Sequence, residues 1–158
     1  TGIFIQTGYF GGLSYNVQFG DILIVTAAEM ADGVSNWYLP DQQIVQSDRE
    51  LIEAAINFCE GRGLSYVTGT VFTTGAIMVE TDELIQNWAE RGHIGVDMET
   101  ATTLAVARKF NRKAIGLLNL SDHIIKGDTF YTPNNKRNEI KEKTDEKLRE
   151  LALYLSRL

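Results

Sequence analysis

Four short apolar runs, separated by polar and helical segments, constrain the fold of this chain more than any other feature. The runs cover residues 3–7, 22–25, 66–74 and 113–120. Each is brief and rich in β-branched or apolar residues, which favours a strand over a helix. Strands that alternate with helices are typical of α/β domains. We therefore expect an α/β fold around a central sheet, and 158 residues suit one domain.

The first long helix has recognisable signals at both ends. Ser47 and Glu50 have the spacing of a capping box, in which each side chain satisfies a free backbone N–H. Gly61 and Gly63 are typical of a helix end. The sole cysteine, Cys59, falls on the apolar face between them, so we interpret it as a buried structural thiol.

Two further helices are expected to begin at Thr81 and at Asp97, with Asp97 as the N-cap of a helix over 98–110. The segments 8–12, 30–46 and 123–133 are expected to be loops. The apolar residues expected to face inward are Leu84, Ile85 and Trp88 in the helix after Thr81, and Ile140, Thr144, Leu148, Leu151 and Leu155 in a C-terminal helix.

Charge and composition exclude several classes of function. Lys and Arg number 15 against 21 Asp and Glu, giving a net charge of −6, which is unfavourable for binding nucleic acid. No apolar run approaches the roughly 20 residues of a membrane span. A single cysteine permits no intrachain disulfide, so we expect a cytoplasmic setting. His93 and His123 lack a second ligand at metal-binding spacing, so no metal site is expected.

Two segments place a carboxylate at the boundary of a regular element. Glu99 falls in the first turn of a predicted helix, and Asp122 follows the carboxyl end of a predicted strand. Ligands of open α/β sheets bind outside the carboxyl ends of strands, which favours Asp122 as a functional residue. Structural alternatives remain open for both, because Glu99 could complement the helix dipole and Asp122 could cap a turn.

The glycine-rich segment 8–12 follows the first predicted strand and could present backbone N–H groups to an anion. It has neither the Gly-Lys-Ser/Thr ending of a P-loop nor the dinucleotide-binding glycine pattern. A simple tight turn explains it equally well. The sequence also lacks a Gly-x-Ser-x-Gly elbow, so an α/β-hydrolase triad is not supported.

Taken in order, these segments resemble the nucleoside phosphorylase and nucleosidase superfamily. The resemblance rests on QTGYFGGL at 6–13, GDILI at 20–24, the stretch from Asp32-Gly33 to Leu39-Pro40, FTT at 72–74, VDMETA at 96–101 and SDH at 121–123. It implies a central mixed, partly barrel-like β-sheet flanked by helices, and a dimer-based homo-oligomer that is often a hexamer. It also implies that residues 1–158 are the C-terminal part of a single domain, lacking its N-terminal strands.

The resemblance also implies roles for individual residues. Asp122 would protonate the purine base as a general acid, a task for an Asp whose pKa is raised. Glu99 would accept hydrogen bonds from the ribose hydroxyls, as a carboxylate can from two donors at once. Gln6 and Thr7 would lie near the phosphate, and Lys136 or, as the better candidate, Arg137 would assist Asp122. The remaining substrate-binding residues implied are Met98, Ser121, Thr73, Thr74, Ile77, Gly8 and Tyr9.

The function implied is cleavage of the N-glycosidic bond of purine nucleosides, by phosphorolysis to free base and ribose 1-phosphate. Phosphate is then a co-substrate, and no cofactor is expected. Two departures keep alternatives open. Gln6 stands where the phosphorylases have an Arg, and a neutral amide cannot form the bidentate charged pair with phosphate, so hydrolysis by a nucleosidase is one alternative. Tyr9 replaces a small residue, and uridine phosphorolysis or a non-catalytic storage or binding role are the others.

Overall fold

A computed structural model describes residues 2–129, 131 and 134–158, so part of the predicted loop 123–133 lies outside the described residues. In chain order its elements are β1 (Ile3–Gly12), β2 (Ile22–Ala31), α1 (Ser35–Tyr38), β3 (Ile44–Gln46), α2 (Arg49–Arg62), β4 (Tyr66–Thr74), η1 (Ile77–Val79), α3 (Asp82–Glu90), β5 (Gly95–Asp97), α4 (Thr100–Lys109), β6 (Lys113–Asp122), η2 (Ile124–Lys126) and α5 (Asn135–Leu155), where η marks a 3-10 helix.

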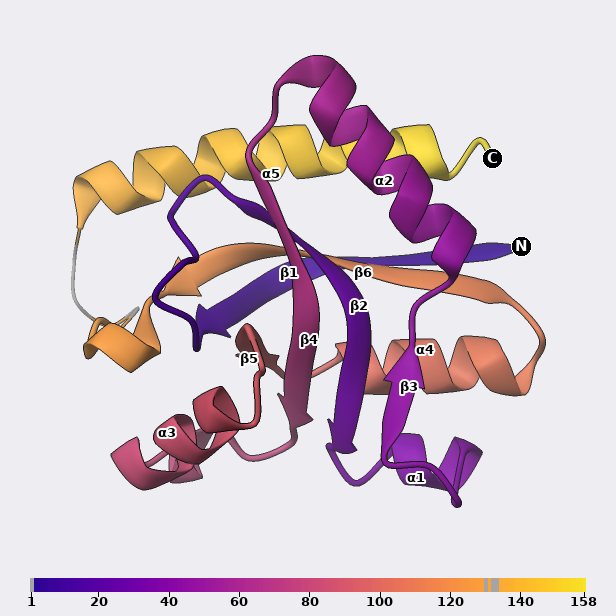
Figure 1. The fold of residues 1–158 in the computed structure, drawn as a ribbon, viewed down its shortest axis with the longest axis horizontal. Coiled ribbons are helices and arrows are strands. Elements are labelled where there is room, and N and C mark those ends of the chain that lie inside the picture. The colour runs from indigo at the N-terminus through magenta and orange to yellow at the C-terminus, as the bar shows by residue number, and fades with distance from the viewer. Residues whose placement is uncertain (1, 130, 132–133) are drawn as a thin grey trace.

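The strands form one mixed sheet that closes on itself (Figure 1). Its order is β3-β2-β4-β5-β1-β6, and an additional pairing between β2 and β6 joins the two sides into a ring of β2, β4, β5, β1 and β6. Pairing is parallel for β1–β6, β2–β4 and β4–β5, and antiparallel for β1–β5, β2–β6 and β2–β3. The expected mixed, barrel-like α/β fold is therefore confirmed.

The first strand is longer than predicted, because the glycine segment 8–12 continues it instead of forming a loop. β1 pairs with β6 from Ile3 to Gly11 and with β5 at Gly11 and Gly12. Glycine within a strand often marks a close approach of neighbouring chains. A Cβ placed on Gly12 would lie 2.9 Å from Leu120 Cδ1. The glycines thus permit close strand packing.

Pairing also extends other strands beyond their predicted ends. β2 continues to Ala31, which pairs with Thr74, and the predicted loop 30–46 contains α1 and β3. β6 continues to Asp122, which pairs with Gly11, so Asp122 ends the strand instead of following it. The strand predicted over residues 66–74 is confirmed as β4.

Helix α2 begins one residue later than the capping-box prediction requires. Asp48 is the N-cap, and its carboxylate accepts a hydrogen bond from the Leu51 backbone N–H at 3.2 Å. The Ser47 hydroxyl is buried and has no hydrogen-bond partner among the described residues, so the predicted capping box is wrong. The predicted end is correct, since Gly63 is the C-cap with a positive φ of 62°.

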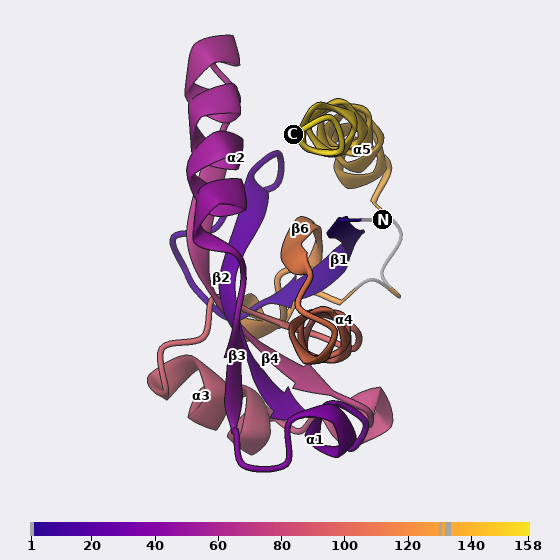
Figure 2. The same cartoon turned by 90° about the vertical axis from the view of Figure 1, so that its right-hand side faces the viewer.

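Alternate residues of β2 and β6 pack into two different parts of the core. Ile22 and Ile24 pack with α2 and α5, whereas Leu23 and Val25 pack with α4 (Figure 2). Cys59 is fully buried in the first part, and burial raises its pKa to about 11, in agreement with a structural thiol. In the part of the chain that the structure describes, no helix combines the length and apolar character that crossing a membrane requires.

The predicted inward faces of α3 and α5 are only partly correct. Trp88 is buried, but Leu84 is exposed because it lies on the outer side of the short α3. In α5, Ile140 is only half-buried, and Arg137 is an additional buried residue. Thr144, Leu148, Leu151 and Leu155 are buried as predicted.

Candidate functional site

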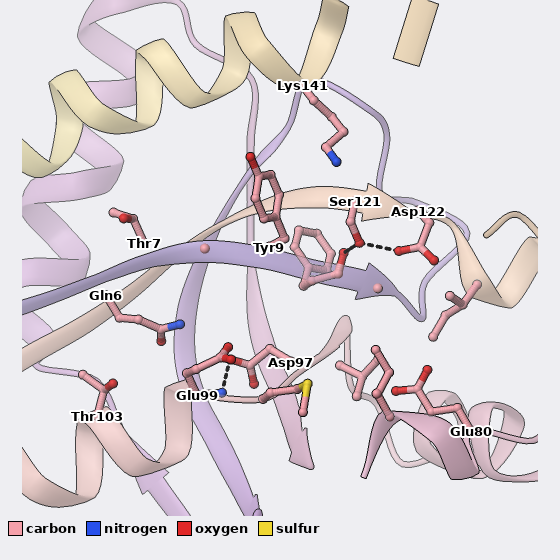
Figure 3. A pocket seen from close by; sticks show the side chains of 17 residues that line it. Gln6, Thr7, Tyr9, Glu80, Asp97, Glu99, Thr103, Ser121, Asp122 and Lys141 are labelled. Atoms are coloured by element: carbon pink, nitrogen blue, oxygen red, sulfur yellow. Dashed lines mark hydrogen bonds between the residues drawn. The ribbon is translucent and has the colours of Figure 1, made fainter. Parts of the chain in front are cut away.

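The ends of β1, β5 and β6 converge on a cavity of about 710 Å³ (Figure 3). It collects most of the predicted site residues from distant parts of the chain. The lining consists of Gln6, Thr7, Gly8, Tyr9, Phe10, Gly11, Ile77, Glu80, Val96, Asp97, Met98, Glu99, Thr103, Ser121, Asp122, Ile124 and Lys141. Its size is within the range of small-molecule pockets.

We call the segment from Asp97 to Thr100 the β5–α4 wall of the cavity. Asp97 is only 5% exposed, and one of its carboxylate oxygens accepts a hydrogen bond from the Thr73 hydroxyl at 2.7 Å. The other accepts from the Thr100 backbone N–H at 2.8 Å and lies 2.5 Å from the Thr100 hydroxyl. Thr73 in turn accepts a bond from the Ala101 N–H at 3.1 Å. A buried and well-satisfied network therefore fixes this wall.

Asp97 caps the first turn of α4 through its side chain, as predicted, but the helix begins at Thr100 instead of 98. Met98 and Glu99 consequently precede the helix and line the cavity. The Glu99 side chain makes no capping hydrogen bond, which weakens the dipole interpretation. Partial desolvation by the cavity wall raises the pKa of Glu99, and the charge of Asp97 adds to this effect.

We call the opposite group, formed by Ile77, Glu80, Ser121, Asp122, Ile124 and Lys141, the β6–η1 wall. Asp122 is 3% exposed at the end of β6. The Ser121 hydroxyl is hydrogen bonded to the Asp122 carboxylate and lies 3.0 Å from the Phe10 carbonyl oxygen. This contact orients Asp122 as the sequence analysis expected of Ser121.

Glu80 and Lys141 are cavity residues that the sequence analysis missed. Glu80 follows η1, and its side chain points toward the Asp122 side of the cavity in Figure 3. Burial and the charge of Asp122 both raise the pKa of Glu80. Lys141 lies in α5, and its Nζ is 4.5 Å from the centre of the Tyr9 ring. Neither residue belongs to a sequence motif, so only the folding of η1 and α5 over the strand ends identifies them.

Residues of β1 cross the cavity between the two walls. Gln6 Oε1 lies 2.6 Å from Thr100 Oγ1, so Gln6 is connected to the β5–α4 wall. The Tyr9 hydroxyl donates a hydrogen bond to Asp145 at 2.6 Å, which raises the pKa of Tyr9 to about 12. Asp145 also accepts a bond from the Asn119 amide at 2.8 Å. These contacts fix α5 against β1 and β6, and thereby position Lys141.

Three of the predicted site residues do not line the cavity. Thr73 is buried in the Asp97 network, and the Thr74 hydroxyl accepts a hydrogen bond from the Ala76 N–H at 3.2 Å. Arg137 is buried and forms an ion pair with Asp128 at 3.0 Å. The basic residue that lines the cavity is Lys141, one helical turn further along α5.

The two histidines are hydrogen bonded within the protein and are separate from each other. His93 lies 2.9 Å from a Glu29 carboxylate oxygen and 3.1 Å from the Thr70 hydroxyl. His123 Nε2 lies 2.8 Å from the Val17 carbonyl oxygen. Within residues 2–129, 131 and 134–158, no cluster of His, Cys, Asp and Glu has the makings of a metal site.

Curated relatives resemble this chain over part of their length. A DeoD-type purine nucleoside phosphorylase of Myxococcus xanthus is 30% identical over 152 residues, which are 96% of this chain and 61% of the relative. The corresponding enzyme of Clostridium beijerinckii is 27% identical over 125 residues, or 78% of this chain and 53% of the relative. The chain thus spans between half and three fifths of these relatives.

Solved structures show the same fold. A uridine phosphorylase from Vibrio fischeri ES114 superposes with a TM-score of 0.83 at 22% identity, covering 96% of this chain and 62% of that one. An AMP nucleosidase from Bacteroides thetaiotaomicron VPI-5482 has a TM-score of 0.70 at 29% identity, covering 94% and 61%. The family model described as the Phosphorylase superfamily matches residues 2–158. Because that match includes both walls of the cavity, the chain belongs to the phosphorylase superfamily.

Proposed function

We propose that this protein cleaves the N-glycosidic bond of purine nucleosides and transfers the ribosyl group to phosphate. One observation carries the proposal: Glu99 and the Ser121–Asp122 pair line a single nucleoside-sized cavity from opposite walls. A hydrogen-bond acceptor for sugar hydroxyls and an acid for the base are thereby available together. The purine nucleoside phosphorylases among the relatives support the same substrate class.

In the proposed reaction Asp122 acts at the base. Its protonated carboxyl donates a proton to N7 of the purine as the C1′–N9 bond breaks, and the bonding electrons remain with the base. Ser121 positions the carboxyl. Positive charge develops on the ribose, and a phosphate oxygen forms the new bond to C1′. Ribose 1-phosphate and the free base are the products.

Glu99 and Met98 bind the ribose in this arrangement. The Glu99 carboxylate accepts hydrogen bonds from the sugar hydroxyls, and Met98 covers the ring with an apolar surface. Gln6, Thr7, Gly8 and Tyr9 lie along β1 between the two walls. They are the proposed neighbours of the sugar and the phosphate, with Ile77 beside the base. Lys141 takes the place of Arg137 as the basic residue of the cavity.

Hydrolysis is a second candidate, favoured by the charge of the cavity. Its described lining contains the carboxylates of Glu80, Asp97, Glu99 and Asp122 and a single cation, Lys141. Carboxylates repel phosphate, and Gln6 adds no charge. The AMP nucleosidase neighbour is consistent with this chemistry. Water would then form the bond to C1′, lose a proton and give free ribose.

Product analysis separates the two candidates. Adenosine, inosine and uridine are incubated with the protein in the presence and absence of inorganic phosphate. Phosphorolysis requires phosphate and gives ribose 1-phosphate, whereas hydrolysis gives ribose in both conditions. Cleavage of uridine in preference to both purine nucleosides would contradict the assignment of the base. Tight nucleoside binding without cleavage would instead support a storage or binding role.

The proposal includes a homo-oligomer built from dimers, a cytoplasmic location and no cofactor besides phosphate. Large exposed apolar residues support self-association, since Trp37 is 86% and Met78 is 85% exposed. Sedimentation velocity over a range of concentrations tests this part. A species of 17.7 kDa at every concentration would contradict it.

A further inference from the structure

We infer that Glu80 is a specificity-determining residue that selects purines carrying an amino group next to N7, as in adenine. This inference rests on the proposed function, because it assumes a purine base beside Asp122. It concerns a residue that no motif identifies and that follows a 3-10 helix far from β6 in the sequence.

The geometry brings two carboxyl groups to the same end of the cavity. Glu80 and Asp122 both line it, from the end of η1 and the end of β6, and Figure 3 shows the Glu80 side chain directed toward the Asp122 side. No described residue hydrogen-bonds the Glu80 carboxyl, and its backbone N–H is bound to the Ile77 carbonyl at 3.3 Å. The backbone is thus held while the carboxyl stays available to a ligand.

Two neighbouring carboxyl groups at this end favour a state with one proton between them. The charge of Asp122 and partial burial raise the pKa of Glu80, which shows that the two groups interact. Such a pair loses its protons in separate steps, so an intermediate form with one acid and one carboxylate exists. When Asp122 holds the proton for N7, Glu80 is an ionised acceptor.

This pattern of one donor and one acceptor matches one kind of purine edge. Adenine presents the acceptor N7 next to the donor N6–H₂, whereas a 6-oxopurine presents two acceptors, N7 and O6. Asp122 would donate to N7 in both cases. Glu80 would accept from the amino group of adenine but would face the lone pairs of O6 in hypoxanthine. An unmatched charged acceptor costs about 1.5–3 kcal/mol, or about 10- to 100-fold in selectivity.

The test compares adenosine with inosine in the wild-type protein and in Glu80→Gln. We expect the wild-type kcat/KM to favour adenosine about 10- to 100-fold. The amide can donate as well as accept, so Glu80→Gln should bring the ratio close to one while still cleaving inosine. Glu83→Gln is the matched control, because Glu83 is exposed in the first turn of α3 and does not line the cavity. It should keep the wild-type ratio.

A binding measurement separates this inference from the proposed function. Calorimetry with free adenine and hypoxanthine reports base selectivity without any reaction. Adenine selectivity that Glu80→Gln abolishes supports the role of Glu80 even if no nucleoside is cleaved. Equal affinity for the two bases, no binding of either base, or a ratio that Glu80→Gln leaves unchanged would overturn it. Thermal melting confirms that both variants are folded.

Discussion

The two walls of the cavity are held in different ways. In the β5–α4 wall, Asp97, Thr73 and Thr100 form a buried hydrogen-bond network, and the backbone of the wall is part of it. In the β6–η1 wall, Asp122 is oriented by Ser121, but Glu80 and Lys141 reach the cavity from η1 and α5. The first wall is preorganised by strands and a helix cap, whereas the second depends on short and peripheral elements.

This difference suggests a division of labour for the proposed reaction. A fixed wall suits the ribose, which is common to all nucleosides, because rigid acceptors lose little entropy on binding. A wall assembled from several elements suits the base, which differs among nucleosides. Substitutions on the two walls should therefore have separable effects on stability, catalysis and specificity.

Asp97→Asn attacks the fixed wall and is expected to have the largest effect. An amide has one acceptor oxygen, so it cannot accept from Thr73 on one side and from Thr100 on the other. Loss of a buried, charge-assisted network should lower the free energy of unfolding by about 3 kcal/mol. Urea denaturation measures it. Asp82→Asn, at an exposed site in the first turn of α3, is the control. Equal effects of the two substitutions would contradict the network.

Asp122→Asn tests the opposite wall and should reduce catalysis more than stability. General acid catalysis is worth about 100-fold or more, so kcat for purine nucleosides should fall by that factor. Steady-state kinetics with a second substrate, whose base leaves without protonation, provides the comparison. That substrate should lose much less activity. An equal loss for both substrates would exclude Asp122 as the acid.

Glu99→Gln should weaken sugar recognition while leaving the fold intact, because the side chain makes no capping bond. We expect KM to rise about tenfold, consistent with one lost charged hydrogen bond, and the melting temperature to change little. The pKa of Glu99 is raised, so protonation begins at a higher pH than in an ordinary Glu. The wild-type KM should accordingly increase as the pH falls, and the variant should lose this dependence. A collapsed melting temperature with unchanged KM would make Glu99 structural.

Tyr9→Phe should have the smallest effect, since Tyr9 is 47% exposed and its bond to Asp145 is partly screened. Its folded pKa of about 12 exceeds the ordinary value of 10.0, so the folded state holds the proton more tightly. The stabilisation is therefore present below pH 10 and is lost as the pH rises toward 12. Urea midpoints of the wild type and the variant should differ slightly at pH 8 and converge above pH 11. A constant difference across this range would contradict the assignment.

Local signals predicted the elements that depend on neighbouring residues. The strand over 66–74, the Gly63 helix end and the capping roles of Thr81 and Asp97 are all confirmed. Errors arose where distant segments decide. The glycines at 8–12 looked like a loop until β5 and β6 paired with them, and β2 and β6 were extended by the same kind of pairing.

The sequence by itself determined the α/β class, the buried state of Cys59 and the segments that carry Glu99 and Asp122. Only the tertiary structure decided that β2 pairs with β6 to close the ring, that Arg137 turns to Asp128, and that Glu80 and Lys141 enter the cavity. The physical reason is the range of the interactions. Strand and helix preferences act between near neighbours, whereas the composition of a cavity depends on packing between elements that the sequence separates widely.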